Sequence, residues 1–546
     1  MSARPGGGLT ARVVLTVLLA WLVLYPILIL VGDAVGGGGS GLTAFATRPA
    51  EWRALWASVW ISVASVALAA AIGVPLAFLF EWFEFPGRKT LGSLIALPAV
   101  LPPFVGVIAF LFLYGESGFV ARAVQQIFGL EQSPWRLQGA GGILLVHAYS
   151  MYVYFYLFTR AGLAKLDASM LEAAQALGAS RWSTLWRVTL PLLRPSLAGA
   201  ALLVFMTAVG SFSAPYVFGG GFRVMTTQIV ASKLNGELRL AEVESVALAL
   251  VAIAGLVLLR RSEGDDIVTA LGKGTAPRRR PIGGAGARAF STTAGWALAV
   301  LLLLPHLTLV LISLVPYGSW TTETLPPVLS GINYQRLFAE PERLRPLVNS
   351  LWMAAGSTAG AIALALVAAG LVARGRPSRL RGAIEGLIAL PWALPGTVFA
   401  IALLTTFSVH SPVTLRWVLA GTTLLLPLAY MVRNVPVTGR ALLAGYRQLD
   451  PGLEEAAASL GAGRWATFRR VTLPLLTPAL AAGGSLAFVA GLGDFVTSIV
   501  LYTYDNRPIS IEIMASLRVS ELGVAAAFGV ILMVVSAAVL GLGARR

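Results

Sequence analysis

The sequence predicts an all-α polytopic membrane protein with about twelve transmembrane helices, arranged as two parallel six-helix repeats. Three observations support this prediction. Of the 546 residues, 57% are apolar and only 12% are charged. Runs of about 20 apolar residues recur along the chain, and each is long enough to cross a bilayer core of about 30 Å. A polar stretch also occurs twice at a constant offset of 283 residues, and an internal repeat of this kind defines the architecture.

The apolar runs form two sets of six. The first set lies near residues 13–31, 56–80, 91–114, 140–159, 196–218 and 241–259, and the second near 292–315, 348–373, 384–407, 417–432, 478–502 and 522–543. The first run is too long for the apolar core of a signal peptide and lacks a small-residue cleavage site, so we expect an uncleaved span. Because each set holds an even number of spans, the halves are expected to be parallel copies.

The formal charge of +16 reflects membrane topology. If the N-terminus lies inside, most of the 41 Lys and Arg residues fall in inner segments. This asymmetry follows the positive-inside rule and predicts that both termini and both polar repeats are cytoplasmic. The basic charge is therefore no indication of a nucleic-acid partner.

The repeat divides the chain into three segments. A first half covers residues 1–259 and contains a cytoplasmic polar loop at 165–191. A cytoplasmic linker covers residues 260–291, is rich in Gly, Pro and Arg, and has no apolar periodicity. A second half covers residues 292–546, with its polar loop at 448–474.

Few residues of this chain suit metal or cofactor chemistry. The absence of Cys excludes disulfides, thiolate metal sites and Cys nucleophiles. His147, His306 and His410 are far apart and show no ligand spacing. We therefore expect no metal site and no cofactor.

A second, shorter repeat carries prolines inside apolar sequence. LIALPAVLPPFV at residues 94–105 recurs as LIALPWALPGTV at residues 387–398. The prolines shared by the two copies are Pro98, Pro102, Pro391 and Pro395. Proline interrupts the helical hydrogen-bond ladder, which a membrane tolerates only where protein or a water-filled cavity satisfies the freed groups. The pattern fits a kinked helix lining a translocation pathway, and it also fits a simple packing kink.

Two further features of the spans are candidates for the pathway. An aromatic cluster, Tyr149 to Tyr156, closes the fourth run and fits either an interfacial belt or a cation-binding wall. Ser211 in the first half matches Asp494 in the second, near the outer end of its span. An ionisable residue at membrane depth is a functional candidate. The alternative is a solvated interfacial carboxylate, or one paired with an outer-loop arginine such as Arg507.

The longer polar repeat predicts two short helices joined at a glycine. Residues 172–191 read EAAQALGASRWSTLWRVTLP, and residues 455–474 read EAAASLGAGRWATFRRVTLP. An Asp, which is a good N-cap, precedes each EAA run at positions 167 and 450. Gly178 and Gly461 end these runs, as a C-terminal glycine does. A second helix is expected from Arg181 or Arg464 to the Leu-Pro pair, leaving Glu, Arg and Trp side chains exposed.

This stretch resembles the EAA signature of bacterial ABC importer permeases. That signature is EAA, three residues, Gly, nine residues, an aliphatic residue, one residue and Leu-Pro. Both copies match it. In that family the loop forms the coupling helix on the cytoplasmic ATPase. The coupling residues that the resemblance implies are Glu172, Ala173, Ala174, Gly178 and Arg181, and Glu455, Ala456, Ala457, Gly461 and Arg464.

The resemblance also implies the partners. The chain contains no phosphate-binding GxxxxGK[ST] motif, so it is not expected to be an enzyme itself. With both permease halves fused, one copy would work with two copies of a cytoplasmic ABC ATPase. A periplasmic or lipid-anchored substrate-binding protein would deliver the substrate at the bacterial inner membrane.

The fused two-motif layout resembles ferric-iron permeases first and thiamine permeases next. Residues 491–513 resemble the iron branch, which implies ferric iron as the substrate. Thiamine is the alternative, followed by polyamines or phosphonates. A secondary transporter is a different class, which would need several intramembrane acids or His residues, and only Asp494 approaches that description.

Overall fold

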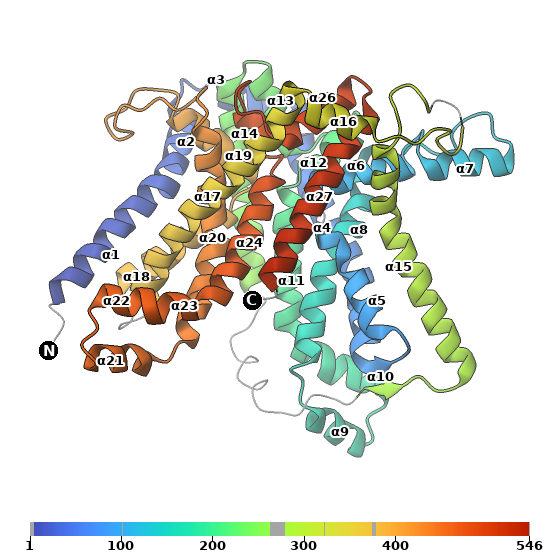
Figure 1. Cartoon of the computed structure of the whole chain (residues 1–546), viewed down its shortest axis with the longest axis horizontal. Coiled ribbons are helices and arrows are strands. Elements are labelled where there is room, and N and C mark those ends of the chain that lie inside the picture. The colour runs from blue at the N-terminus through green and yellow to red at the C-terminus, as the bar shows by residue number, and fades with distance from the viewer. Residues whose placement is uncertain (1–4, 101, 262–278, 321–322, 374–377, 545–546) are drawn as a thin grey trace. The chain divides into compact units, whose positions relative to one another are not determined.

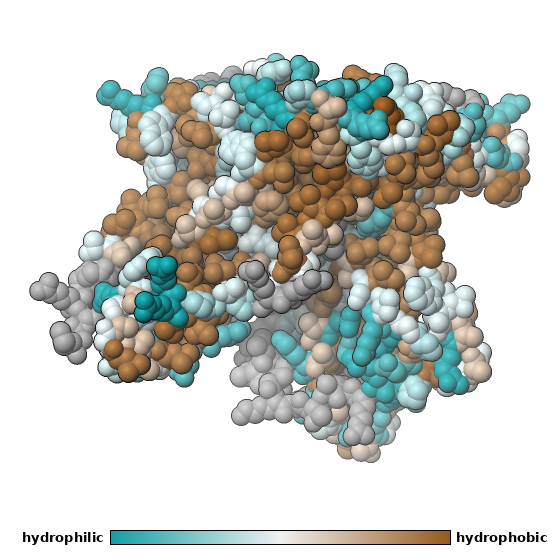
Figure 2. All heavy atoms as spheres, in the orientation of Figure 1, coloured by the Kyte–Doolittle hydropathy of each residue, from teal (hydrophilic) through white to brown (hydrophobic). Residues whose placement is uncertain are grey.

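The computed structural model describes residues 5–100, 102–261, 279–320, 323–373 and 378–544, and these ranges are mainly helical (Figure 1). Over these ranges, nine helices are long and apolar enough to cross a membrane, or up to eleven if each of two bent pairs is one span. The all-α polytopic prediction is confirmed. Figure 2 shows apolar side chains around the middle of the spans and polar ones at their ends.

The chain divides into two compact units. One contains Met1–Phe45, Ile229–Val246 and Ser330–Arg546, and the other contains Ala46–Gln228 and Ala247–Leu329. α13 (Met225–Leu234) and α14 (Leu238–Arg261) each contribute residues to both units.

The first unit is built around three long helices, α17 (Pro341–Ala373), α20 (Leu425–Gln448) and α24 (Thr477–Leu492). Small and apolar side chains are buried where these helices meet, including Ala365, Leu442 and Leu476. The other helices of this unit are α1 (Pro5–Leu19), α2 (Tyr25–Gly36), α3 (Ser40–Thr47), α16 (Ile332–Ala339), α18 (Arg379–Ala389), α19 (Gly396–Thr406), α21 (Pro451–Ser459), α22 (Arg464–Thr467), α23 (Leu473–Leu475), α25 (Ser498–Leu501), α26 (Ile509–Arg518) and α27 (Leu522–Ala544).

The second unit repeats this core with α4 (Pro49–Trp82), α8 (Gly139–Leu163) and α11 (Leu190–Val209). Ala69, Phe155 and Val204 are buried where these helices meet. Its other elements are β1 (Phe83–Glu84), α5 (Arg88–Ile95), α6 (Pro103–Tyr114), α7 (Phe119–Phe128), α9 (Ala168–Ala176), α10 (Arg181–Thr184), α12 (Ser213–Phe218), β2 (Arg280–Pro281) and α15 (Ala285–Ser313). β1 and β2 pair in parallel, and most of the predicted linker lies outside the described residues.

Each unit takes its first span from the other half of the sequence. In the first unit, Trp21 Nε1 donates a hydrogen bond to the Val413 carbonyl at 2.7 Å, and Leu15 and Leu19 pack with Ile384. In the second unit, Tyr149 donates a hydrogen bond to a carbonyl of α15 at 2.8 Å. The compact units therefore differ from the sequence halves, whose boundaries at residues 259 and 292 stay a prediction.

Two expectations need correction. The span predicted near residues 417–432 is α20, which begins at Leu425 and continues to Gln448. Most of this helix does not form an apolar run, because it contains Arg433, Arg440 and Arg447. The apolar pattern therefore predicts a span that is too short at its C-terminal end.

The tyrosine cluster does not form an interfacial belt. Tyr152 and Tyr156 are buried and donate hydrogen bonds to the carbonyls of Ile95 and Gly92 in α5. The two rings pack α8 against α5. Each buried hydroxyl can be accommodated there because it donates to a backbone carbonyl.

Candidate coupling and translocation site

The first polar loop is a short helix closed at both ends. The Asp167 carboxylate accepts a hydrogen bond at 3.0 Å from the amide two residues later and caps α9. At the other end, Gly178 has a φ of +84° and donates to the Gln175 carbonyl at 2.9 Å, while Ala179 donates to Ala174 at 3.0 Å. This pair of bonds is a Schellman motif, and it satisfies carbonyls that a helix end leaves open.

The second polar loop has the same geometry. Asp450 accepts a hydrogen bond at 2.9 Å from the Gly452 amide and caps α21. Gly461 also has a φ of +84°, and Ala462 donates to the Ala457 carbonyl at 3.0 Å. The predicted pair of helices at a glycine bend is thus found in both halves.

The conformation of the bend, and not crowding, requires glycine at these positions. A Cβ added at Gly178 or Gly461 would have no neighbouring atom within 4 Å. The positive φ is nevertheless a region that residues with a Cβ adopt at a cost, with Asn the mildest case.

Both loops expose apolar side chains. Neither α9 nor α21 has a buried residue, and Leu177 and Leu460 are each 89% exposed. Trp182 and Trp465 are exposed as well. Each loop thus presents large apolar side chains next to a polar, capped helix, an arrangement typical of contact surfaces.

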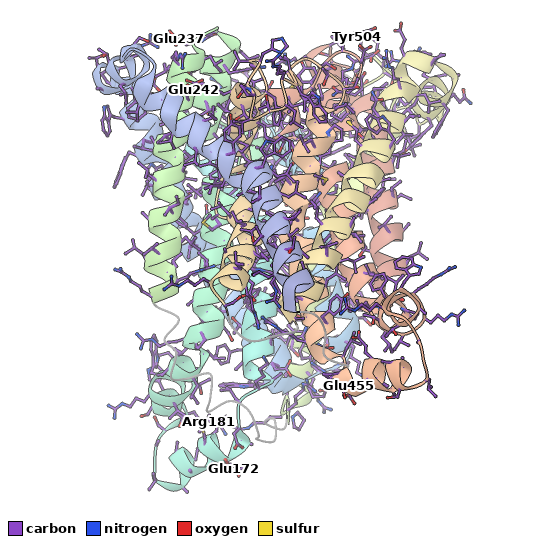
Figure 3. All side chains as sticks on the ribbon, turned by 90° about the vertical axis from the view of Figure 1, so that its left-hand side faces the viewer. Glu172, Arg181, Glu237, Glu242, Glu455 and Tyr504 are labelled. Atoms are coloured by element: carbon purple, nitrogen blue, oxygen red, sulfur yellow. The ribbon has the colours of Figure 1, made fainter. Side chains whose placement is uncertain are left out.

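The predicted coupling residues lie on these two surfaces. Glu172, Ala173, Gly178, Arg181, Glu455, Ala456, Gly461 and Arg464 are exposed, and Ala174 and Ala457 are half-buried. Figure 3 places Glu172 and Arg181 together on the first loop. Within its own unit, Glu455 lies at the end opposite Glu237 and Tyr504 (Figure 3).

The second helix of the first loop does not close at Leu-Pro as predicted, whereas that of the second loop ends at Leu475, directly after its Leu-Pro pair. In the first loop, α10 continues through a π-helical turn, Leu185–Thr189, into α11 without a break. The Leu190 amide bonds to the Leu185 carbonyl, so the wider π turn accommodates the missing amide donor of Pro191 next to it. In the second loop, a similar turn, Phe468–Thr472, leads to a 68° bend before α24. Each loop is therefore joined directly to a membrane span.

The paired prolines break their helices. Pro98 and Pro391 lie in 3₁₀ turns, Leu97–Val100 and Leu390–Trp392, and Pro102 and Pro395 begin the next helix as N-caps. In the second half the two arms, α18 and α19, meet at 107°. The expected kinked helix is thus two separate helices. That these breaks line a pathway stays a prediction.

Asp494 is held in an ion pair by an arginine of the neighbouring helix. Its Oδ2 lies 3.1 Å from Nη1 of Arg433 on α20, and the same oxygen accepts a hydrogen bond from the Thr497 hydroxyl at 3.0 Å. Its Oδ1 accepts the Thr497 amide at 2.7 Å. The side chain is only 13% exposed. Arg507, the partner considered from the sequence, pairs with Glu512 at 2.9 Å.

A chain of hydrogen bonds through His147 occupies the matching place in the other unit. The Ser211 hydroxyl lies 2.9 Å from Nε2 of His147, and Nδ1 of His147 lies 2.8 Å from the Ser65 hydroxyl. Arg433 and His147 were not among the residues predicted for this site. For His147 the available signal was an ionisable ring inside an apolar run; Arg433 follows directly after the predicted end of its span.

Across the described part of the chain, no cluster of three or more His, Asp or Glu side chains could hold a metal ion. Asp494 is therefore not part of such a cluster within the described residues.

Both halves of the repeat match one known family. Residues 70–262 and 361–545 match the binding-protein-dependent transport system inner membrane component. The chain belongs to this family. It is accordingly a multi-pass inner-membrane permease of an ABC importer, a transport subunit and not itself an enzyme. Binding-protein-dependent transport implies a binding protein and an ATPase as partners.

Individual permeases show the same relationship. The chain is 31% identical over 454 residues to the probable ABC transporter permease protein y4fN of Sinorhizobium fredii, covering 83% of this chain and 79% of that protein. It is 28% identical to the ferric transport system permease protein FbpB of Actinobacillus pleuropneumoniae, covering 81% and 64%. It is 29% identical to the thiamine transport system permease protein ThiP of Escherichia coli, covering 81% and 79%.

Proposed function

We propose that the two polar loops are the coupling helices of this permease and that each docks on one of two cytoplasmic ATPase subunits. The observation that carries this proposal is that both loops have matching caps, glycine bends and exposed Leu and Trp side chains. The proposal places both chain termini in the cytoplasm, which the distribution of Lys and Arg supports.

The loop geometry supports the transmission of force. A helix with both ends satisfied keeps its shape under load better than an uncapped one. Because each loop runs directly into α11 or towards α24, displacement of a docked helix would move a span of its own unit. Such a rigid-body movement is a common element of switching transitions.

Ferric iron is the substrate that we propose, delivered by a periplasmic or lipid-anchored binding protein. Two relatives, from Actinobacillus pleuropneumoniae and Haemophilus influenzae, carry names that specify ferric transport. Asp494 offers a single carboxylate, which already pairs with Arg433 and accepts a hydrogen bond from Thr497. One such ligand is too few to retain a hard cation, so the site suits the passage of an ion better than its stable binding. Thiamine is the alternative, supported by the similarity to ThiP.

Uptake of radiolabelled ferric iron and of thiamine tests these proposals, in a bacterial strain lacking this chain and complemented with variants. Wild type should restore iron uptake, and vanadate should stop it. Gly178→Arg should abolish uptake, because a bulky cation at the bend would spoil the docking surface. Gly178→Asn is the matched control and should retain uptake, since Asn tolerates positive φ.

The outcomes separate the two proposals. Normal uptake by Gly178→Arg would overturn the coupling role. Thiamine uptake with the same pattern of variants would overturn ferric iron and leave the coupling role intact.

A further inference from the structure

A cavity of about 300 Å³ opens in the first unit between α17, α18 and α20. Its floor is apolar and built from small and aliphatic side chains, among them Ala368, Val372 and Gly439. Its charged lining residues are Glu385, Arg440 and Arg447. The proposed translocation residues are not among those that line it.

The internal repeat provides a reference for this cavity. α4 and α17 align at an offset of 292 residues, which matches Ser58 with Ser350. The structure supports this alignment, because Ser58 accepts a hydrogen bond from the Met225 amide at 2.7 Å and Ser350 accepts one from the Ile509 amide at 2.8 Å. α8 and α20 align at the offset of 283 residues found for the polar loops, since Gly162 approaches Leu193 as Gly445 approaches Leu476. Positions of α17 and α20 can therefore be compared with α4 and α8.

In the second unit, large side chains fill the equivalent space. Tyr156 matches Gly439 and Phe80 matches Val372. The Tyr156 and Phe80 rings pack edge to face at 5.9 Å in one buried cluster with Ile95. The cavity thus results from smaller residues at equivalent positions. Protein interiors are close-packed and an empty space lowers stability, so a cavity of this size suits an occupant.

The charges at the cavity are also specific to this unit. Arg440, Arg447 and Glu385 match Leu157, Ala164 and Gly92 in the other half. Glu385 Oε1 lies 3.1 Å from Nε of Arg381 and 3.4 Å from Nη2 of Arg447. Together with Arg440, three arginines therefore accompany one glutamate at the opening of the cavity. The Arg440 guanidinium lies 5.1 Å from the centre of the Trp392 ring. The opening is therefore cationic and the floor is apolar.

We propose that this cavity binds an anionic phospholipid, with the phosphate at Arg440 and Arg447 and an acyl chain over the apolar floor. Arg447 lies three residues before Asp450, the cap of the second polar loop, so the opening is at the membrane face that carries this loop. Basic pockets between spans at the cytoplasmic face are recognised sites for acidic lipid headgroups. The proposal uses the proposed function only to identify that face as cytoplasmic. A free phosphate would match the arginines and leave the apolar floor uncovered.

Native mass spectrometry of the purified full-length chain tests the proposal, with phosphatidylglycerol, phosphatidylcholine and glycerol 3-phosphate as separate probes. Wild type should retain phosphatidylglycerol in preference to phosphatidylcholine. In R440Q/R447Q the affinity should fall about 25-fold, because each arginine near a bilayer surface contributes about fivefold. R260Q/R261Q removes the same charge from exposed positions at the end of α14 and should bind as wild type does.

Gly439→Tyr introduces the residue of the other half and should abolish binding by filling the cavity. An added Cβ would lie 2.8 Å from Ile388, so the arginine variant provides the test if the tyrosine variant does not fold. Unchanged lipid retention in R440Q/R447Q would overturn the proposal. Binding of glycerol 3-phosphate as tight as that of the lipid would also overturn it, in favour of a soluble phosphate ligand. Neither result depends on transport, so the proposed function would be unaffected.

Discussion

Asp494 and Ser211 occupy equivalent positions of the repeat, but only Asp494 is a charged residue. Each has a partner of matching chemistry. Asp494 faces the arginine of α20, whereas Ser211 faces the imidazole of His147. A charged side chain in a poorly hydrated place is stable only when an opposite charge and hydrogen bonds compensate it. The two copies therefore differ in their partners as well, and the ion pair belongs to one of them.

The Arg433–Asp494 pair should behave as a coupled unit in stability measurements. Arg433→Gln leaves the carboxylate without its counter-ion and should cost about 2 kcal/mol in the free energy of unfolding, less than for a fully buried pair because both groups keep some exposure. Adding Asp494→Asn to that variant should restore most of the loss. Thermal unfolding of the purified chain in detergent measures both changes.

An exposed pair serves as the control for that cycle. Arg345 and Asp505 lie 2.7 Å apart but are largely exposed, so Arg345→Gln should cost less than about 1 kcal/mol. An Arg433→Gln cost as small as this would show that Asp494 is solvated and that the pair has no structural weight.

The sequence predicts one side of each of these contacts and not the other. Asp494 stands out because it is acidic within an apolar run, and Ser211 because the repeat aligns it with Asp494. Arg433 is not predicted as a partner of Asp494, because the sequence of its helix resembles a short apolar span followed by a basic loop. Only the packing of α20 against α24 brings the arginine to the carboxylate, and periodicity along one helix does not report which neighbour that helix faces.

The polar loops can be predicted almost completely, because their structure depends on local interactions. An Asp cap, a short run of helix formers and a glycine act within about ten residues, so local sequence is sufficient. The exchange of first spans between the two units, in contrast, cannot be predicted from local sequence. Trp21 meets Val413 across most of the chain, and nothing in the local pattern of either segment specifies the other.

The caps of α9 and α21 should contribute to coupling through helix stability. Asp167→Ala together with Asp450→Ala removes the carboxylate that accepts from one backbone amide of each helix, and should destabilise each helix by about 1 kcal/mol. Uptake should fall while the amount of protein in the membrane stays constant. Ser caps helices nearly as well as Asp, so the matched Asp→Ser pair should retain uptake. Equal loss in both pairs would assign the effect to the carboxylate charge instead of the cap.

A second element-level contact should respond to pH. Arg343 at the start of α17 donates hydrogen bonds of 2.7 and 3.0 Å to Glu521, just before α27, and these hold the pKa of that carboxyl below its ordinary 4.5. The folded chain therefore binds this proton less readily than the unfolded chain. The resulting stability is complete above about pH 4.5 and is lost as the pH falls through the folded pKa.

Arg343→Gln should remove this part of the acid sensitivity. The thermal midpoint of the variant should fall less steeply than that of the wild type as the pH drops from about 5 to about 3. Arg345→Gln, two residues along the same helix, alters a largely exposed pair and should keep the wild-type slope. Parallel slopes for wild type and Arg343→Gln would show that other carboxyl groups cause the acid response.

At the scale of the whole molecule, the sequence halves and the compact units are organised differently. Each unit pairs the later spans of one half with the first span of the other. Neither half alone therefore contains all the surfaces that bury its own core.

The absence of cysteine makes the orientation of the whole chain directly measurable. Single cysteines at Leu177 and Leu460 report the two polar loops, and one at Tyr504 reports the opposite end of its unit; all three side chains are largely exposed. In intact cells, a membrane-impermeant maleimide should label Tyr504→Cys and leave Leu177→Cys and Leu460→Cys unlabelled. In inverted membrane vesicles the pattern should reverse. Each variant is compared with the wild type, which provides a zero baseline. Labelling of either loop from outside would contradict the cytoplasmic placement of the termini and the coupling role together, because an ATPase that uses cellular ATP can reach only the inner face.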